Sequence, residues 1–250
     1  MMCLTYDFRP RSSCIIVLVL GLSYSVIGQH VTEKNENSKA SGFVDFNAYR
    51  DTRAFSELTI NALANVTDRI QYFSLTNNSG APNTSDVQSF FSEQNIRWKV
   101  AKNSPVDFTS QWTLRTGEDN DNWRLGFRVR LNNLTPLESL FSKINLTYSL
   151  NFHLLQFDFD KPVKYFTQME HVYRLLLFPE LLNRRVYISG FADQNFRSGG
   201  EENKTKWVTE HQLGIRIINE FYIVAEYRVN DFFSSDHYGL GYGLEYKIIF

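Results

Sequence analysis

Charged side chains that could bind or select a solute stand at every second position of several segments in this chain. The clearest case spans residues 122–132, where three arginines alternate with large apolar residues. The same alternation adds basic residues upstream. The resulting set, which we call the basic wall, comprises Arg97, Lys99, Arg115, Arg124, Arg128 and Arg130. Such a row of cationic groups attracts anions and, in a narrow passage, selects solutes by charge.

A second set near the end of the sequence mixes both signs of charge. Its members, each on the polar face of an alternating segment, are Glu210, Tyr222, Glu226, Arg228 and Glu245. Counting along neighbouring segments puts Arg228 near Glu210, and Tyr187 and Phe191 could add rings to the same face. Two interpretations stay open. The charges pair and plug the space between them, or they form a constriction that selects small polar solutes.

The segments that carry these residues have a period of two, which indicates strands with one apolar face and one polar face. About twelve follow one another without a helical pattern of useful length. They span residues 42–50, 56–64, 68–76, 95–102, 108–116, 122–132, 144–157, 163–178, 185–194, 207–218, 221–230 and 238–250. The third slips at Tyr72 and Phe73, which predicts a bulge. The series predicts an all-β fold.

The links between these segments alternate in length, as they do in an up-and-down antiparallel barrel that crosses a membrane. Long or strongly polar links follow the third, fifth, ninth and eleventh segments, and short ones follow the second, eighth and tenth. The link after the third segment is expected to run through residues 76–94. The link after the sixth breaks the parity and is expected to hold a helical turn from Pro136 to Ser142 at one rim.

The first 28 residues have the pattern of a secretory signal peptide. Arg9 and Arg11 precede an apolar run at residues 14–27, and small residues follow for cleavage. Both cysteines, Cys3 and Cys14, fall inside this leader. Residues 29–41 are polar and aperiodic, and we expect a flexible lead-in there. The barrel domain is expected to span residues 42–250.

Composition narrows the class of protein. The chain has 26 basic and 27 acidic residues, a net charge of −1, which gives no support for nucleic-acid binding. With 21 Phe and 13 Tyr it favours β-structure. A soluble barrel turns its apolar face inward, whereas a membrane barrel turns it outward. The heavily charged polar face favours the membrane barrel, and His171 and His211 would then face outward.

The last segment, Tyr238 to Phe250, reads YGLGYGLEYKIIF and ends on an aromatic residue. Behind a secretory leader, such a strand resembles the C-terminal strand of a bacterial outer-membrane barrel. The resemblance implies that outer-membrane lipid surrounds the protein. It also implies that the barrel-assembly machinery recognises the strand ending at Phe250.

A narrower resemblance covers the last hairpin. FYIVAEYRVNDFF followed by YGLGYGLEYKIIF is similar to the end of the nucleoside-specific channel-forming family, whose members are twelve-stranded outer-membrane channels. The resemblance implies candidate solute contacts, namely Glu210, Tyr222, Glu226, Arg228 and Glu245. The basic wall has no counterpart in that resemblance and could favour an anion.

Three functions follow from these observations. The first is a narrow passive channel for a small polar solute, either nucleoside-like or anionic. The second is a structural or adhesive barrel with a plugged lumen. The third is an outer-membrane hydrolase whose site lies in the last outer loop, where His237 stands beside Ser234, Ser235 and Asp236. We expect the channel, with no catalytic residue, no cofactor and no metal site.

Overall fold

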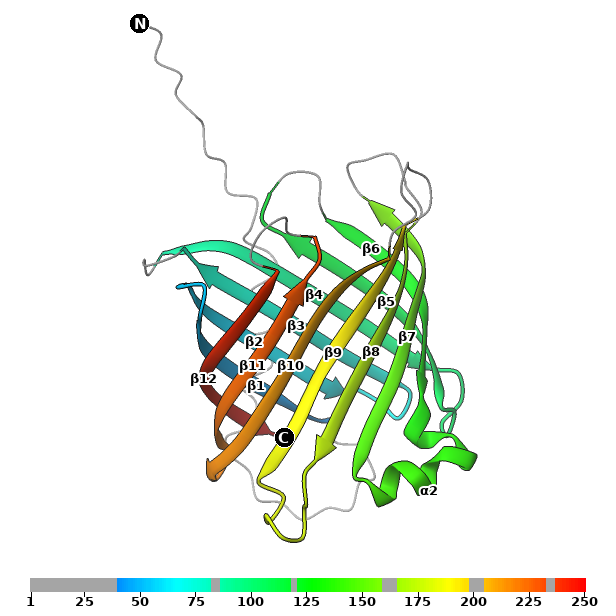
Figure 1. Cartoon of the computed structure of the whole chain (residues 1–250). Helices are drawn as coiled ribbons and strands as arrows, with labels where there is room; N and C mark the ends of the chain where they lie inside the picture. The colour runs from blue at the N-terminus through cyan, green and yellow to red at the C-terminus, as the bar shows by residue number, and fades with distance from the viewer. Residues whose placement is uncertain (1–39, 82–85, 118–120, 159–165, 198–204, 233–236) are drawn as a thin grey trace, which may run out of the picture. The chain divides into compact units, whose positions relative to one another are not determined.

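The computed structural model describes residues 40–81, 86–117, 121–158, 166–197, 205–232 and 237–250. In this part of the chain, twelve strands pair in sequence order into a closed antiparallel barrel (Figure 1). The strands are β1 (Ser41–Asp51), β2 (Ser56–Asn65), β3 (Ile70–Gly80), β4 (Val87–Lys99), β5 (Val106–Arg115), β6 (Asn122–Arg130), β7 (Leu146–Asp158), β8 (Phe166–Leu176), β9 (Val186–Arg197), β10 (Thr205–Ile218), β11 (Phe221–Asn230) and β12 (Tyr238–Ile249). The predicted up-and-down barrel is confirmed.

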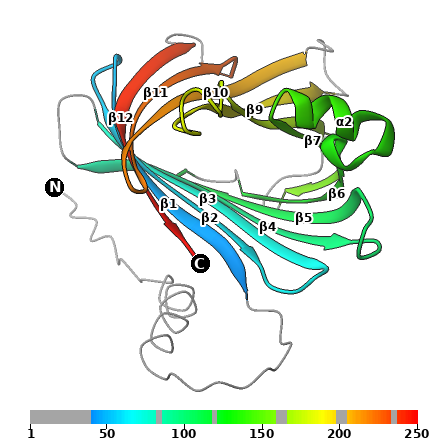
Figure 2. The same ribbon diagram turned by 90° about the horizontal axis from the view of Figure 1, so that it is seen from below.

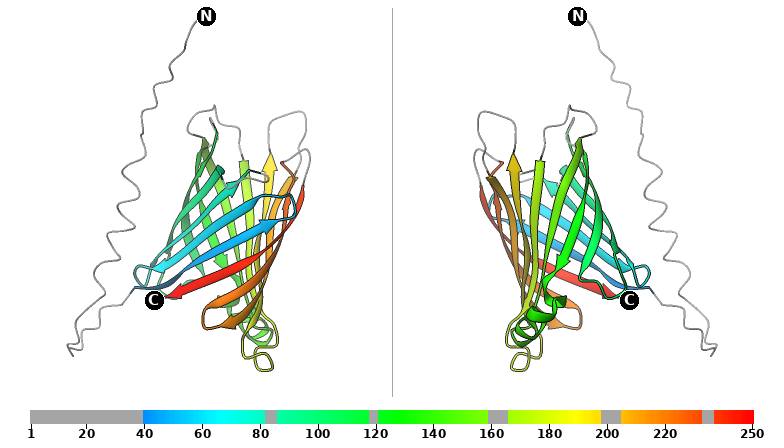
Figure 3. Two further views of the ribbon diagram at one scale, coloured as in Figure 1. Left: turned by 90° about the vertical axis from the view of Figure 1, so that its left-hand side faces the viewer. Right: turned by 90° about the vertical axis from the view of Figure 1, so that its right-hand side faces the viewer.

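The barrel closes where β1 meets β12. The two strands pair over nine residues, and beyond them the Gly42 N–H donates to the Phe250 carbonyl at 2.8 Å. Seen from below, β1–β5 form one wall and β9–β12 lie opposite (Figure 2). The strands are steeply inclined, which the blue and cyan strands show best (Figure 3). Such inclination accompanies closure of a sheet into a barrel.

One rim carries the two short helices, η1 (Leu131–Asn133) and α2 (Thr135–Lys143). Pro136 stands in the first turn of α2, where its missing N–H costs nothing. The helix that the sequence predicted from Pro136 to Ser142 is therefore present. The C-terminus lies at the same end of the barrel (Figure 1). We call this end the α2 rim, and the opposite end, where β1, β5 and β11 stop, the far rim.

The structure corrects the sequence analysis at β3 and β4. These strands pair from Ile70 with Trp98 as far as Ser79 with Ser89, so the link between them is 81–86 and not 76–94. The predicted bulge at Tyr72 and Phe73 is also wrong, because the register runs through both residues without a shift. Polar residues occupy the outward face of β3 here. Side chains still alternate between the two faces, but apolar and polar residues no longer alternate with them.

The inner and outer faces of the barrel differ sharply in polarity. On β12, Leu244 is 47% exposed on the outside, whereas its neighbour Glu245 is 1% exposed inside. On β6, Arg124 and Arg128 are buried inside, and Phe127 stacks on Phe152 of β7 outside. An apolar outer face around a charged inner face is the arrangement of a barrel in a lipid bilayer. Among the described residues, no helix has the length and apolarity needed to cross a membrane.

The two outward histidines are confirmed, and each has a tyrosine partner from another strand on the same outer face. The Tyr148 hydroxyl and His171 Nδ1 are 2.6 Å apart, and the Tyr173 hydroxyl and His211 Nδ1 are 2.8 Å apart. These pairs satisfy one ring nitrogen of each histidine without water. The expected leader, residues 1–28, and the lead-in up to residue 39 lie outside the described residues, and β1 begins at Ser41.

Candidate functional site

All ten sequence-predicted site residues belong to the inner face of the barrel, but they do not gather at one place. Arg97 lies on β4, Arg115 on β5 and three arginines on β6, with registers that align them with inward neighbours. Glu210 is on β10, three residues are on β11 and Glu245 is on β12. The two sets therefore form separate groups, on different sectors of the wall.

The centre of the basic wall is organised by one carboxylate. Asp107, on β5, is completely buried and accepts a hydrogen bond from Arg128 Nε at 2.7 Å. Its other oxygen accepts from Arg130 Nη2 at 3.1 Å. Two guanidinium groups thus share a single negative charge. Burial of this group requires such pairing, because an isolated buried charge is costly.

Arg97 completes this centre without a carboxylate of its own. Its Nη1 is 3.4 Å from Gln71 Oε1, which also accepts from Arg128 Nη1 at 3.0 Å. The guanidinium carbon lies 5.0 Å from the centre of the Phe73 ring. Among the described residues Arg97 forms no ion pair within 4 Å. Within ion-pairing distance, the centre of the wall therefore has three guanidinium groups and one carboxylate.

A cluster of carboxylates lies beside this centre on the inner face, with one member on β4, the strand of Arg97, and the others on β8 and β9. Glu93, Glu170 and Asp193 interact electrostatically with one another and with Arg97 or Arg124. His153, 1% exposed, places Nε2 3.8 Å from Glu170 Oε2. The sequence analysis missed this cluster, since Glu93 fell in a supposed link and β8 and β9 showed mixed faces. Asp107 had a usable signal, because it shares parity with inward Thr109 and Gln111.

The second group is built around one guanidinium, and we call it the acidic seam: Glu57, Glu210, Glu226 and Arg228. Arg228 donates through Nη1 to Glu57 and through Nε to Glu226. Glu210 is the cross-strand neighbour of Arg228 on β10. The expected proximity of Arg228 to Glu210 is therefore present, whereas Glu57 was not foreseen because β2 seemed far from β11 in sequence.

Glu245 belongs to a third cluster, near the α2 rim. It accepts from Lys247 Nζ at 2.8 Å and from the Tyr187 hydroxyl. Tyr222 packs edge-on against Tyr187, with ring centres 5.7 Å apart. The expected inward position of both rings is observed. Each ring is already in contact with protein, because Tyr187 is 2% and Tyr222 6% exposed.

Inward glycines make room for these large side chains. A Cβ at Gly239 on β12 would overlap the guanidinium of Arg53, which folds in from the 52–55 link and forms an ion pair with Asp51 at 2.8 Å. A Cβ at Gly214 on β10 would overlap the ring of Tyr187. The glycines therefore let side chains fill the barrel. Arg115 lies apart, at the far end of β5, over the ring of Phe91.

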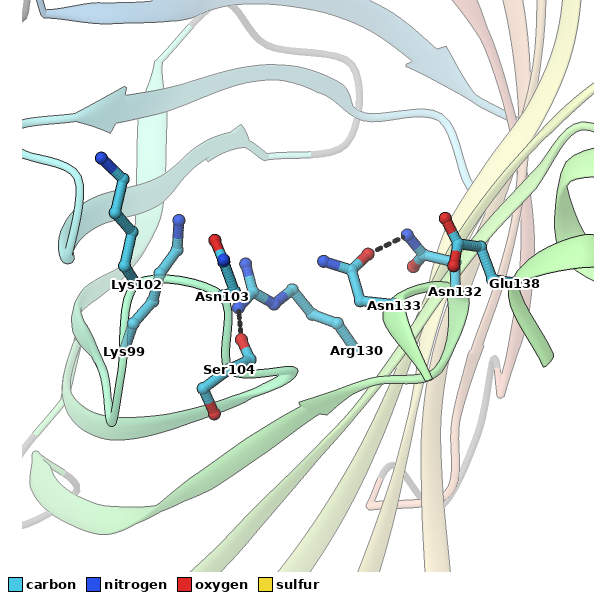
Figure 4. A pocket seen from close by; sticks show the side chains of 8 residues that line it. All are labelled: Lys99, Lys102, Asn103, Ser104, Arg130, Asn132, Asn133 and Glu138. Carbon is cyan, nitrogen blue, oxygen red and sulfur yellow. Dashed lines mark hydrogen bonds between the residues drawn. The ribbon is translucent and has the colours of Figure 1, made fainter. Parts of the chain in front are cut away.

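A polar cavity of about 310 Å³ opens beside α2 and η1 (Figure 4). Its basic groups are Lys99, Lys102 and Arg130, and in Figure 4 the Arg130 side chain extends toward Asn103. Arg130 also donates to the Ser104 carbonyl at 2.5 Å and joins the cavity to buried Asp107. Arg130 thus belongs both to the lining of this cavity and to the basic wall. In the part of the chain that the structure describes, no group of three acidic, histidine or cysteine residues is arranged to hold a metal.

Comparison with solved structures identifies the class of fold. A KdgM porin superposes with a TM-score of 0.51 at 11% identity, covering 82% of this chain and 98% of the porin. A KdgM porin in complex with disordered oligogalacturonate gives 0.47 at 13% identity, with coverage of 82% and 98%. No protein-family model matches the chain, and no curated protein matches it.

At this identity the likeness shows the fold alone. The chain has the fold of a porin-type outer-membrane barrel, with twelve antiparallel strands in sequence order. The predicted resemblance to outer-membrane barrels is confirmed at this level. These comparisons do not show the narrower likeness to the nucleoside-specific channel-forming family.

Proposed function

We propose that this protein is a narrow passive channel of the bacterial outer membrane, which passes small polar solutes and prefers anions. The observation that carries the proposal is the excess of guanidinium groups over ion-paired carboxylates at the centre of the basic wall, where Arg128 and Arg130 share Asp107 and Arg97 forms no ion pair within 4 Å among the described residues. A charged wall in a tube with low-dielectric surroundings concentrates counter-ions and selects solutes by charge.

The cavity at the α2 rim supports the same direction of selectivity. Lys99, Lys102 and Arg130 line it, with Glu138 as the acidic residue among its lining groups. An anion that enters there meets cationic groups from the rim to the wall. Outer-membrane lipid is the surrounding medium in this proposal, because apolar side chains such as Leu244 cover the outside.

Reconstitution in a planar bilayer tests the channel directly. We expect discrete conductance steps. In a KCl gradient, the reversal potential should shift toward the equilibrium potential of chloride. Arg97→Gln is the informative variant, because Arg97 has no ion pair among the described residues and its removal does not strand a bonded carboxylate. It should lower the chloride-to-potassium permeability ratio, and the change should shrink as the salt concentration rises, because salt screens the field of a fixed charge.

Two further variants complete the series. Arg128→Glu should reverse the preference, since it puts a negative charge beside Asp107. Arg50→Glu, on the exposed end of β1, is a matched charge reversal away from the inner face and should leave the ratio close to wild type. Unchanged selectivity in Arg97→Gln, or an equal change in Arg50→Glu, would count against an anion path along the wall.

A nucleoside is the alternative solute, and it rests on the inward rings of Tyr187 and Tyr222. Aromatic faces stack on planar bases. A nucleoside path needs these rings to move apart, since they pack on each other at an interplanar angle of 71°. Block of the ion current by uridine but not by ribose, lost in Tyr222→Leu, would favour this solute.

A plugged structural barrel is the second candidate, and one observation favours it. Inward side chains such as Asp107, His153 and Glu245 are at most 1% exposed, so protein atoms fill much of the interior. Passage through such a barrel requires side chains to move aside. Absence of conductance at every voltage, in a barrel shown to be folded by heat-modifiable migration, would favour the plug.

Two further expectations stay predictions. The hydrolase alternative rests on His237 beside Ser234, Ser235 and Asp236, and the last three lie outside the described residues. Recognition of the C-terminal strand by the assembly machinery is supported by the place of Phe250, which pairs with Gly42 where β1 and β12 close the barrel. Phe250→Lys should lower the yield of inserted barrel, whereas Phe232→Lys should not.

A further inference from the structure

The outer wall of β4 interrupts the apolar surface of the barrel. Its outward residues run from Phe90 through Ser92, Gln94 and Ile96 to Trp98. Phe90, Ile96 and Trp98 are 38%, 47% and 46% exposed, as expected of side chains that face lipid. The two polar residues therefore lie inside the apolar belt and not at its edge, where water could reach them.

The adjoining face of β3 extends this interruption, and we call the whole the polar sector. Its members are Tyr72, Ser74, Thr76, Asn78, Ser92 and Gln94, which lie side by side in the β3–β4 register. Ser74 stands opposite Gln94, and Thr76 stands opposite Ser92. On the other flank, small residues of β2 pair with β3: Ala62 with Ser74 and Ala64 with Tyr72. The sector is thus flat as well as polar.

Four of the six residues form a hydrogen-bonded chain along the surface. The Tyr72 hydroxyl donates to Gln94 Oε1, and Gln94 Nε2 donates to Ser92 Oγ at 2.8 Å. Thr76 Oγ1 and Ser92 Oγ are 3.1 Å apart. Ser92 is only 5% exposed although it points outward, because its neighbours cover it.

The remaining two residues are not satisfied within the barrel. Among the described residues, neither the Ser74 hydroxyl nor the Asn78 amide has a hydrogen-bond partner, and both side chains are partly exposed on the outer face. Hydrocarbon offers neither donors nor acceptors, so such groups are costly against lipid and favour contact with another protein surface. Small and hydroxyl-bearing residues at one face are the composition that lets membrane proteins pack closely.

We propose that the polar sector is the surface through which two copies of this chain associate, related by a two-fold axis along the membrane normal. Two observations choose a second copy as the occupant. The sector carries no charge, so identical surfaces do not repel each other. Its amides and hydroxyls both donate and accept, so the same six residues of another copy supply what Ser74 and Asn78 lack. This proposal goes beyond the channel and does not depend on it.

Cysteine cross-linking tests the symmetry. Ser74→Cys, in a chain with Cys3 and Cys14 changed to serine, has one thiol, so a covalent dimer requires residue 74 to approach its own copy. We expect a dimer with a short bis-maleimide linker in native outer membranes. The matched control is Leu244→Cys, which is exposed on the outer face of β12 outside the sector, and it should stay monomeric.

A second measurement tests the energy of the contact. In Ser74→Ala with Asn78→Leu, the dissociation constant of the dimer in micelles should rise at least about tenfold, the size of one or two lost membrane hydrogen bonds. Gln194→Leu makes the same amide-to-leucine change on the outer face of β9 and should leave the constant unchanged. Wild-type protein that is monomeric in membranes, or equal cross-linking at residues 74 and 244, would overturn the proposal.

Discussion

The centre of the basic wall and the acidic seam both bury clustered charges inside the barrel, but with opposite ratios of acidic to basic groups. In the first, the carboxylate of Asp107 stands between the guanidinium groups of Arg128 and Arg130. In the second, the guanidinium of Arg228 stands between the carboxylates of Glu57 and Glu226. Each group buries charge inside the barrel, but one leaves a positive surplus and the other a negative one.

The difference separates two roles that a buried charge can have. The shared ion in each group, Asp107 or Arg228, cancels repulsion between its partners, and Arg228 also joins β11 to β2, which is distant in sequence. The surplus ions set the electrostatic field that a solute meets. Removal of a shared ion leaves two like charges buried without a counter-ion and should lower the stability of the barrel. Removal of a surplus ion should change selectivity and cost little stability.

The largest effect is expected for Arg228→Met. The change leaves Glu57 and Glu226, which are 6% and 5% exposed, without their common partner. We expect a loss of about 3–5 kcal/mol in the free energy of unfolding. Urea titration of the barrel refolded in lipid vesicles, followed by tryptophan fluorescence, measures it. Arg216→Met, at the α2 end of β10, is the control. A loss below about 1 kcal/mol in Arg228→Met would mean that Arg228 does not hold the acidic seam together.

The corresponding change on the opposite side is Asp107→Asn, which keeps the shape and an acceptor oxygen but removes the charge. Arg128 and Arg130 then repel each other in a site from which water is excluded. We expect a loss of about 2–3 kcal/mol, because some hydrogen bonding survives. The same titration measures it, with exposed Asp86→Asn as the control. An Asp107→Asn barrel as stable as wild type would mean that water enters this centre and screens the two cations.

Sequence reasoning predicted the barrel and missed half of its interior, and both results have physical causes. Alternation shows which side chains share a face of one strand, so Arg124 and Arg128 could be placed inside from β6 alone. Contacts such as Glu57 with Arg228 join residues 171 positions apart in sequence. They depend on barrel closure and on glycines of β12 that leave room, which no single segment reveals.

The errors at β3 and β4 have a different cause. There the sequence loses its hydrophobic alternation because Ser74, Thr76 and Asn78 face outward, where apolar residues were expected. Strand pairing does not need that alternation, because the backbone supplies the hydrogen bonds. Glu93 was missed for the same reason, since it lay in a segment that seemed to be a link.

A smaller effect is expected for Glu210→Gln, which removes a surplus charge from the acidic seam. Glu210 forms no hydrogen bond or ion pair within 4 Å among the described residues, although it lies opposite Arg228. Stability should change by less than about 1 kcal/mol. The chloride-to-potassium permeability ratio should rise where the Glu210 carboxyl is ionised, and more at alkaline than at acidic pH, since only the ionised group adds negative charge to the seam. A loss of stability as large as that of Arg228→Met would show that Glu210 is a structural ion. It would contradict the distinction between shared and surplus ions in the acidic seam.

The smallest effect is expected at the α2 rim, where Lys102 is shared between the cavity and an exposed ion pair. Lys102 Nζ is 2.8 Å from Asp68 Oδ2. The hydrogen bond from Lys102 lowers the pKa of Asp68, and in return it raises the pKa of Lys102. The pair therefore contributes stability above the normal carboxyl pKa and loses that contribution as the pH falls through the lowered value. Because both groups are exposed, this contribution is small, and neither Asp68→Asn nor Lys102→Gln should measurably change the free energy of unfolding.

Selectivity should respond at this rim where stability does not. Asp68→Asn leaves Lys102 without a competing anion at the mouth of the cavity and should raise the chloride preference slightly, whereas Lys102→Gln should lower it. Both shifts should fade between 0.1 and 1 M salt, because the screening length falls from about 10 to about 3 Å. Acidification of wild type through the lowered pKa of Asp68 should reproduce the selectivity of the Asp68→Asn variant, and that variant should lack the response to pH. Equal pH responses in both proteins would place the titrating group deeper in the barrel, and the comparison would then have to include the carboxylates that lie beside the basic wall.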